Sequence, residues 1–205
     1  QGYFKEQNNK TAVFDLFYRN NPSGNGFAVM AGLEQVIEYI KNLHFGESEI
    51  GYLRSTGLFE EDFLGYLKDF KFTGDIYAIP EGTVVFPREP LVKVVAPIME
   101  AQLVETAILN IINHQCLIAT KTVRVVHAAR GDGIMEFGLR RAQGPDAGIY
   151  GARAAMIGGC VGTSNVLAGQ VFDVPVKGTH AHSWIMSFPD ELTAFRTYAK
   201  IYPSA

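Results

Sequence analysis

The residue types best suited to chemistry are concentrated in residues 135–184, beginning with two adjacent arginines, Arg140 and Arg141. They follow a short apolar run. A guanidinium presents its donors in a planar fork that matches a phosphate or a carboxylate, so two of them after an apolar strand indicate an anion site. An ion pair with Glu136 or Asp146 explains the same spacing equally well, and the sequence leaves both interpretations open.

Two histidines one residue apart, His180 and His182, follow another apolar run. A neutral imidazole can act as a base or as a nucleophile near cellular pH. His182 lies between small residues and is the better candidate for such a role. A metal site would need further ligands, and neither an HExxH motif nor a cysteine pair accompanies these histidines. For His180, capping or packing is the alternative.

The elements that must position these side chains follow one repeated pattern. Short apolar runs at 134–139, 160–161 and 174–176 each lead into a polar turn, and Ser164 and Asn165 occupy the second turn. This pattern is typical of β-loop-α units, and folds built from them place their chemistry in the loops after the strands. The sequence therefore predicts an α/β fold that handles an anion.

The first 130 residues follow a different pattern, which predicts separate helices and short strands. Its expected elements are a strand over 11–19, a helix over 27–43, short helices near 48–53 and 60–70, several short strands in 71–97, and a long helix over 98–130. Apolar residues nearly encircle that long helix, so we expect it to be largely buried. We place the domain boundary near Gly131. The domains are then 1–130, with a β-rich subdomain at about 71–97, and 131–205, which ends in a helix over 189–202.

Composition excludes some functions. The net charge of −3 gives no electrostatic case for binding nucleic acid or an anionic membrane, and no apolar run is long enough to span a bilayer. Cys116 and Cys160 lack a CxxC spacing, which favours buried free thiols and a cytoplasmic protein. Three β-α units cannot close a barrel, so we expect a piece of a longer protein, truncated at both ends.

Six separated blocks, in the right order, resemble the nicotinate phosphoribosyltransferase family. They are FDLFYRNNPSGNGFAV (14–29), YAIPEGTVVFPREPLVKV (77–94), LVETAILNIINHQCLIATK (103–121), FGLRRAQGPD (137–146), GTSNVLAG (162–169) and GTHAHSW (178–184). The resemblance implies an N-terminal α+β domain with a β-sandwich-like subdomain, followed by the first units of an irregular α/β barrel. It also implies a homodimer with active sites formed across the subunit interface.

The resemblance implies a specific activity as well. The family makes nicotinate mononucleotide from nicotinate and phosphoribosyl pyrophosphate in NAD salvage, and it couples ATP hydrolysis through a phosphohistidine. His182 matches that histidine, and its phosphate would organise the substrate and Mg²⁺. Phe137 matches the aromatic side chain that stacks on the pyridine ring, and Thr179 matches a nicotinate contact. Arg140 and Arg141 match the arginine pair near the ring and the phosphoribosyl group.

Ser164 bears on the choice of base. Related nicotinamide phosphoribosyltransferases carry an aspartate there, which would repel the carboxylate of nicotinate. Two unit charges ~4 Å apart cost roughly 1–4 kcal/mol, depending on screening. Ser164 removes this repulsion and can donate a hydrogen bond, which favours the acid over the amide. Nicotinamide as the substrate is the alternative.

Other readings remain beside this one. Quinolinate phosphoribosyl transfer would demand a denser basic pocket and uses no phosphohistidine. In the family, a tyrosine that stacks on the other face of nicotinate lies upstream of the segment matched by Gln1, and further ribose- and phosphate-binding residues follow the position of Ala205. We therefore expect these 205 residues alone to be inactive. The alternative, from a different class of function, is an inactive folded fragment that acts only as a binding or structural unit.

Overall fold

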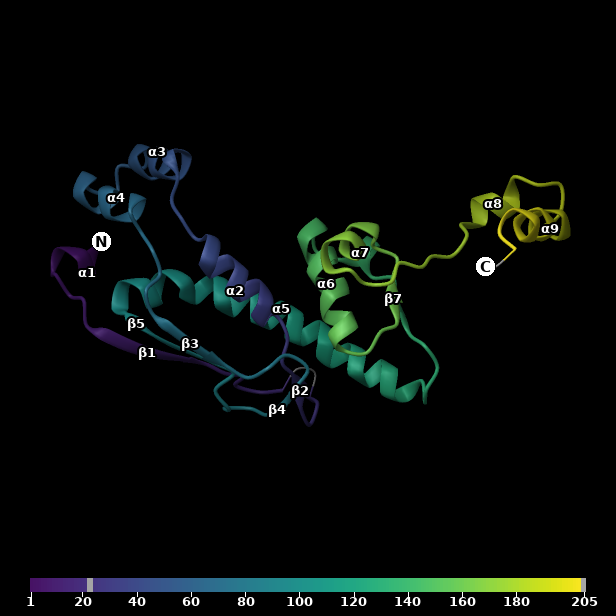
Figure 1. The fold of residues 1–205 in the computed structure, drawn as a ribbon, viewed down its shortest axis with the longest axis horizontal. Helices are drawn as coiled ribbons and strands as arrows, with labels where there is room; N and C mark the ends of the chain where they lie inside the picture. The colour runs from purple at the N-terminus through teal and green to yellow at the C-terminus, as the bar shows by residue number, and fades with distance from the viewer. Residues whose placement is uncertain (22–23, 204–205) are drawn as a thin grey trace.

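The largest sheet joins strands that are far apart in the sequence (Figure 1). The structure is a computed structural model that describes residues 1–21 and 24–203. In the sheet, β5 (Val92–Pro97) lies between β1 (Thr11–Leu16) and β3 (Asp75–Ala78), and both pairings are antiparallel. Every second residue of β5 is buried, as expected for a strand with one face on the core. The predicted first strand is confirmed.

A second sheet pairs β2 (Ala28–Val29) with β4 (Val84–Val85). The helix predicted over 27–43 is therefore wrong in its first third, because α2 spans only Leu33–Asn42. Five consecutive buried residues precede α2, a run that a helix with one buried face does not make. Gly32 then has a φ of 101°, a left-handed conformation that side chains other than glycine rarely adopt and that stops a helix from starting earlier.

The short strands predicted in 71–97 are confirmed, and they include β3, β4 and β5. Their partners come partly from elsewhere, since β5 pairs with β1 and β4 pairs with β2. This range therefore builds its sheets with strands from the first thirty residues. The loop predicted before β2 includes Pro22 and Ser23, and the last predicted unit ends in Ser204 and Ala205; these four residues lie outside the described ranges.

Three short helices form a small cluster at the amino-terminal end. They are α1 (Gly2–Lys5), α3 (Glu47–Ser55) and α4 (Glu61–Lys68). Ile50 of α3 packs with Phe63, Leu64 and Leu67 of α4, and Phe4 of α1 joins them at the edge. The predicted short helices near 48–53 and 60–70 are confirmed, because their apolar residues recur at helical spacing and bury one face.

Both parts of the chain pack against the long helix α5 (Ile98–Ala128; Figure 1). Its position confirms the helix predicted over 98–130. The expectation that it is largely buried holds for only one face, because Leu109, Leu117 and Val125 are exposed. The buried residues of α5 recur every three or four positions, as in Ala101, Val104, Ile108 and Ile112, so they form a single stripe. No helix within the described ranges, α5 included, is both long and apolar enough to cross a membrane.

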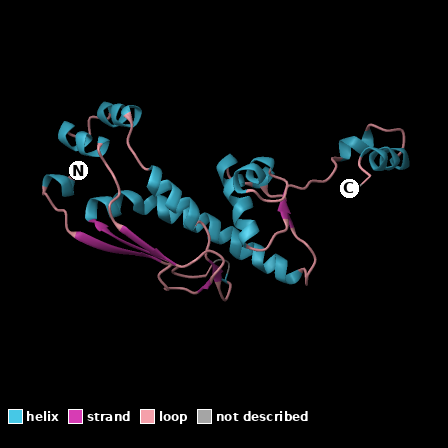
Figure 2. Cartoon of the chain, in the orientation of Figure 1, coloured by secondary structure: helices cyan, strands magenta, loops and turns pink. Residues whose placement is uncertain are grey.

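Very short parallel strands alternate with helices in the carboxyl-terminal part, which is mostly helix and loop in Figure 2. Strand β6 (Met135–Glu136) leads through η2 (Leu139–Arg141) to α6 (Pro145–Ile157), and β7 (Gly162–Thr163) leads to α7 (Val166–Phe172). The three predicted β-loop-α units are thus present, although the strands are shorter than their apolar runs and the third is a single bridge at Val176. The mixture of helices and strands confirms the predicted α/β class.

Two final helices, α8 (His182–Met186) and α9 (Glu191–Ile201), pack on each other at the end of an extended segment (Figure 1). The helix predicted over 189–202 corresponds to α9. It starts at Glu191 because the Asp190 side chain caps it, accepting a hydrogen bond from the Thr193 amide at 2.8 Å.

A close approach between α5 and α6 holds the two parts of the chain together. A Cβ atom added at Gly158, the C-cap of α6, would lie 2.6 Å from the Thr122 Cβ and 2.9 Å from the Ala119 carbonyl oxygen. Both neighbours belong to α5, and one of them is backbone that cannot move aside. Only glycine allows the helices to approach this closely.

We expect Gly158→Ala to lower the free energy of unfolding by about 2 kcal/mol, the usual cost of overpacking a tight contact. Urea unfolding at an unchanged m value measures this cost. The control is Gly65→Ala on α4, where an added Cβ meets no atom within 4 Å. That change should stabilise by roughly 0.5–1 kcal/mol, because alanine is the better helix former. Equal effects of the two substitutions would contradict the close approach.

A candidate anion-binding site at the carboxyl ends of a parallel sheet

Three parallel segments end side by side in the carboxyl-terminal part of the chain. Glu136 of β6 is in register with Thr163 of β7, and Thr163 forms a parallel bridge with Val176 on its other side. Parallel strands in register end at the same edge of their sheet. The polar turns that follow the three apolar runs therefore all begin at one edge of the sheet, as the β-loop-α pattern predicts.

Phe137 and Ser164 directly follow the two paired strand ends. The Ser164 amide donates a hydrogen bond of 3.0 Å to the carbonyl oxygen of Glu136, so the strand pairing continues by one bond into the loops. The Phe137 side chain is 41% exposed and Ser164 is half-buried. The structure thus brings an accessible aromatic ring and a hydroxyl group to the ends of two neighbouring strands.

The arginine pair lies just beyond Phe137, in η2 rather than at the end of a strand. The expected longer strand is wrong because the chain turns after Glu136, and the Arg141 amide closes the turn on the Gly138 carbonyl oxygen at 2.8 Å. Both arginines are exposed. Within the described part of the chain, neither pairs with a carboxylate, so the ion-pair alternative with Glu136 or Asp146 does not hold. Their guanidiniums are available to an anion.

A cavity of about 730 Å³ opens beside this loop, between α5 and α6. Arg141, Glu136 and Asp146 line it together with His114 and Tyr150, whereas Phe137, Arg140 and Ser164 do not. The His114 ring is half-buried, and its Nε2 lies 3.2 Å from the Ala147 carbonyl oxygen, a contact in which the ring nitrogen donates. This hydrogen bond joins His114 of α5 to α6.

Thr179 and His182 are not brought to Phe137. Both are exposed, and His182 is the first residue of α8, which Figure 1 shows well apart from α6, α7 and β7. The His180 ring stacks on Trp184 with 5.3 Å between ring centroids and 19° between planes. That stacking agrees with the packing role considered for His180. Cys116 and Cys160 are buried free thiols, as predicted.

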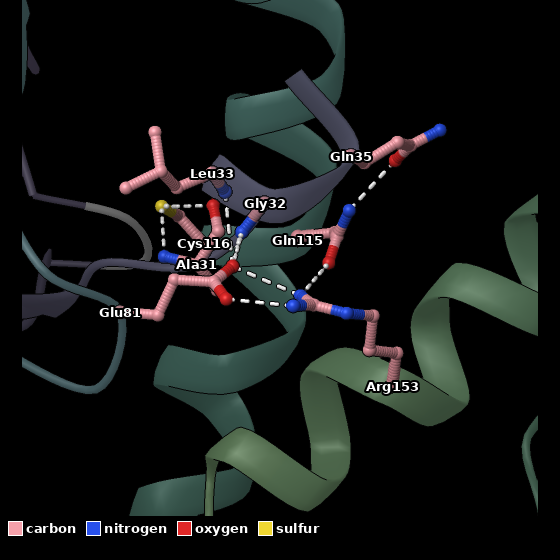
Figure 3. A network of polar contacts seen from close by, with 8 residues as sticks. All are labelled: Ala31, Gly32, Leu33, Gln35, Glu81, Gln115, Cys116 and Arg153. Carbon is pink, nitrogen blue, oxygen red and sulfur yellow. Dashed lines mark hydrogen bonds and ion pairs between the residues drawn. The ribbon is translucent and has the colours of Figure 1, made fainter. Parts of the chain in front are cut away.

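A polar network that sequence reasoning missed connects this part of the chain to the first (Figure 3). Arg153 of α6 donates to both carboxylate oxygens of Glu81, at 2.9 and 2.7 Å. Arg153 also donates to the Gln115 side chain at 3.0 Å, and Gln115 in turn donates to Gln35 at 2.7 Å. The network therefore joins α6, α5, α2 and the turn between β3 and β4.

The Glu81 carboxylate is stabilised in its charged form. It accepts hydrogen bonds from the amides of Gly32 and Leu33, at 2.5 and 2.9 Å, where α2 begins. Burial alone would raise the pKa of Glu81, but the Arg153 guanidinium and these two amides hold the pKa below its ordinary value. One signal in the sequence pointed here: Gln115 is a polar residue at a buried position of the α5 stripe.

The described residues do not build a metal cage. Within residues 1–21 and 24–203, no three His, Cys, Asp or Glu side chains gather in a way that could hold a metal ion. His180 and His182 thus find no third ligand there. Mg²⁺ commonly keeps several waters and binds through substrate phosphates rather than through a dedicated protein site. We therefore assign no residue of this chain to Mg²⁺.

The fold and this site define a mixed α/β protein similar to phosphoribosyltransferases. The structure superposes on the crystal structure of human nicotinic acid phosphoribosyltransferase with a TM-score of 0.84 and 35% sequence identity, over 91% of this chain and 38% of the human one. Two family models match in order: the nicotinate phosphoribosyltransferase N-terminal domain over residues 1–113, and the nicotinate phosphoribosyltransferase family over 133–200. The chain belongs to the nicotinate phosphoribosyltransferase family.

Curated relatives carry the same name. The chain is 46% identical over 204 residues to a nicotinate phosphoribosyltransferase of Mycobacterium tuberculosis, covering 100% of this chain and 44% of that protein. It is 49% identical over 193 residues to the Bacillus subtilis nicotinate phosphoribosyltransferase, covering 94% of this chain and 39% of that protein. The chain thus spans less than half the length of these relatives.

Proposed function

We propose that this chain supplies part of the active site of a nicotinate phosphoribosyltransferase, which forms nicotinate mononucleotide in NAD salvage. The observation that carries the proposal is that both family models match in order, with Phe137, Ser164 and the arginine pair at one sheet edge. In the reaction, the ring nitrogen of nicotinate forms a bond to C1 of the ribose while pyrophosphate leaves. Such a transfer depends on positioning and charge neutralisation more than on a strong base.

Each residue has a role in this proposal. Phe137 stacks on the pyridine ring, and Thr179 contacts the base. Arg140 and Arg141 neutralise the nicotinate carboxylate and the phosphoribosyl phosphates. In support, neither arginine pairs with a carboxylate among residues 1–21 and 24–203. His182 accepts a phosphoryl group from ATP, and Mg²⁺ enters with the phosphates of ATP and phosphoribosyl pyrophosphate.

The proposal extends to the assembly. The three parallel segments are the first units of an irregular α/β barrel, and the two antiparallel sheets form the β-sandwich-like part of the N-terminal domain. The protein acts in the cytoplasm as a homodimer whose sites form between subunits. The separation of α8 from the sheet edge supports a site that needs more than the described part of one chain.

The direct test compares nicotinate with nicotinamide as substrates of the protein at its native length. We expect a clear preference for nicotinate, because Ser164 carries no negative charge that would repel the carboxylate of nicotinate. Ser164→Asp should weaken nicotinate use by roughly 1–4 kcal/mol, or at least about fivefold in kcat/KM. Ser164→Ala, which removes a hydroxyl but adds no charge, is the control and should cost less. Equal use of both bases would refute the selectivity. A folded protein that neither reacts with nor binds nicotinate by calorimetry would refute the activity.

A further inference from the structure

Glu136 is a charged residue inside an apolar run, and the proposed function gives it no role. Its side chain is half-buried at the end of β6, between the two strand ends that lead to Phe137 and Ser164. The carboxylate pairs with no arginine or lysine in the described ranges. It accepts hydrogen bonds from two neutral donors instead. The presence of a carboxylate at this position therefore needs a structural explanation.

One donor lies in the loop that follows β6, and the other is the last residue of β7. One carboxylate oxygen accepts a hydrogen bond from the Thr163 hydroxyl at 2.6 Å, and the other accepts one from the Gly138 amide. Gly138 is the residue after Phe137, and Thr163 is the residue before Ser164. A single carboxylate therefore ties the loop that carries Phe137 to the last residue of β7, which Ser164 directly follows.

The surrounding backbone is built around this contact. Thr163 is fully buried, and its hydroxyl oxygen also accepts a hydrogen bond of 3.0 Å from the Asn165 amide. A Cβ atom at position 138 would lie 2.7 Å from the nearer Glu136 carboxylate oxygen. Glycine at 138 thus leaves the space that the carboxylate occupies.

We propose that Glu136 is a positioning residue that sets the separation of Phe137 and Ser164, and with it the slot for the pyridine ring; this inference rests on the proposed function. A carboxylate suits the task because it accepts at both oxygens and donates at neither. A carboxylate held by the Thr163 hydroxyl and the Gly138 amide also stays off Arg141, which lines the same cavity. The arginine is then left for the substrate anion.

The test uses Thr163→Val, which removes the hydroxyl at nearly unchanged volume, in the protein at its native length. We expect the KM for nicotinate to rise at least tenfold while the KM for phosphoribosyl pyrophosphate changes less than threefold. Thr163→Ser keeps the hydroxyl and should restore the KM for nicotinate to within threefold of the wild-type value. Glu136→Gln, with only one acceptor oxygen, should give an intermediate loss. Thr56→Val makes the same chemical change on the remote end of α3 and should leave both KM values unchanged.

Two outcomes would overturn the proposal: an unchanged KM for nicotinate in Thr163→Val, or an equal rise in both KM values that Thr163→Ser does not restore. A readout without catalysis separates this from a failure of the proposed function. Amide hydrogen exchange at Gly138 should be at least tenfold faster in Thr163→Val than in the wild type, whatever reaction the protein catalyses. Unchanged exchange at Gly138 would refute the tie itself.

Discussion

Replacing His182 with alanine is expected to abolish the stimulation of nicotinate mononucleotide formation by ATP. An imidazole can accept a phosphoryl group at a ring nitrogen, and the phosphate adds a charge of about −1.5 to −2 that can order basic groups and Mg²⁺. Alanine offers no acceptor atom. The rate with ATP should therefore fall to the rate without ATP. The assay measures product with and without ATP, together with transfer of labelled γ-phosphate to the protein.

His180→Phe is the matched control for this prediction. Phenylalanine keeps a ring that can stack on Trp184, the contact that His180 makes in the structure. We expect both ATP stimulation and phosphoryl transfer to survive in this variant. If His182→Ala retains full ATP stimulation, or if the label is lost only in His180→Phe, then His182 is not the phosphoryl acceptor.

The second large effect concerns stability. Arg153→Met should lower the free energy of unfolding by about 3 kcal/mol, near the lower end of the cost of breaking a buried ion pair. The side chains of Arg153 and Glu81 are 15% and 20% exposed, so water replaces the lost partner only in part, and the cost stays at the lower end of that range. Methionine keeps most of the side-chain volume, which isolates the loss of charge and hydrogen bonds. Urea or thermal unfolding measures the change.

The effect of pH on this pair has a defined sign. The folded protein lowers the pKa of Glu81 below the ordinary value of 4.5, so its contribution to stability is present above that value. The contribution is lost as the pH falls through the lowered pKa. The stability difference between the wild type and Arg153→Met should therefore shrink on acidification below about pH 4.5.

A matched control separates this pair from surface ion pairs. Arg54 forms an ion pair with Glu61 on exposed surface, at 2.6 Å. Arg54→Met should leave the unfolding midpoint unchanged, because solvent screens exposed pairs. If Arg153→Met and Arg54→Met behave alike, then the network in Figure 3 does not hold the two parts of the chain together.

Local pattern predicted most of the helices and strands, and it failed where long-range packing decides. Helix α5 and strand β1 follow from their own periodicity. Strand β2 could not be predicted in this way, because it is a strand only through its pairing with β4 more than fifty residues later along the chain. The exposed flank of α5 is a similar case: apolar residues surround the helix, but only a single stripe of them is buried.

The sequence by itself determined the family, the α/β class, the buried thiols and the residue types for binding an anion. Only the tertiary structure decided that Phe137 and Ser164 lie at one sheet edge and that His182 lies apart from them. The tertiary structure likewise decided that neither arginine pairs with a carboxylate of the residues that the structure describes. It also decided the partners of Glu136 and Arg153, which are 27 and 72 residues away along the chain. The physical reason is that periodicity reports which face of an element is buried. Hydrogen bonds between distant residues depend on how those buried faces pack.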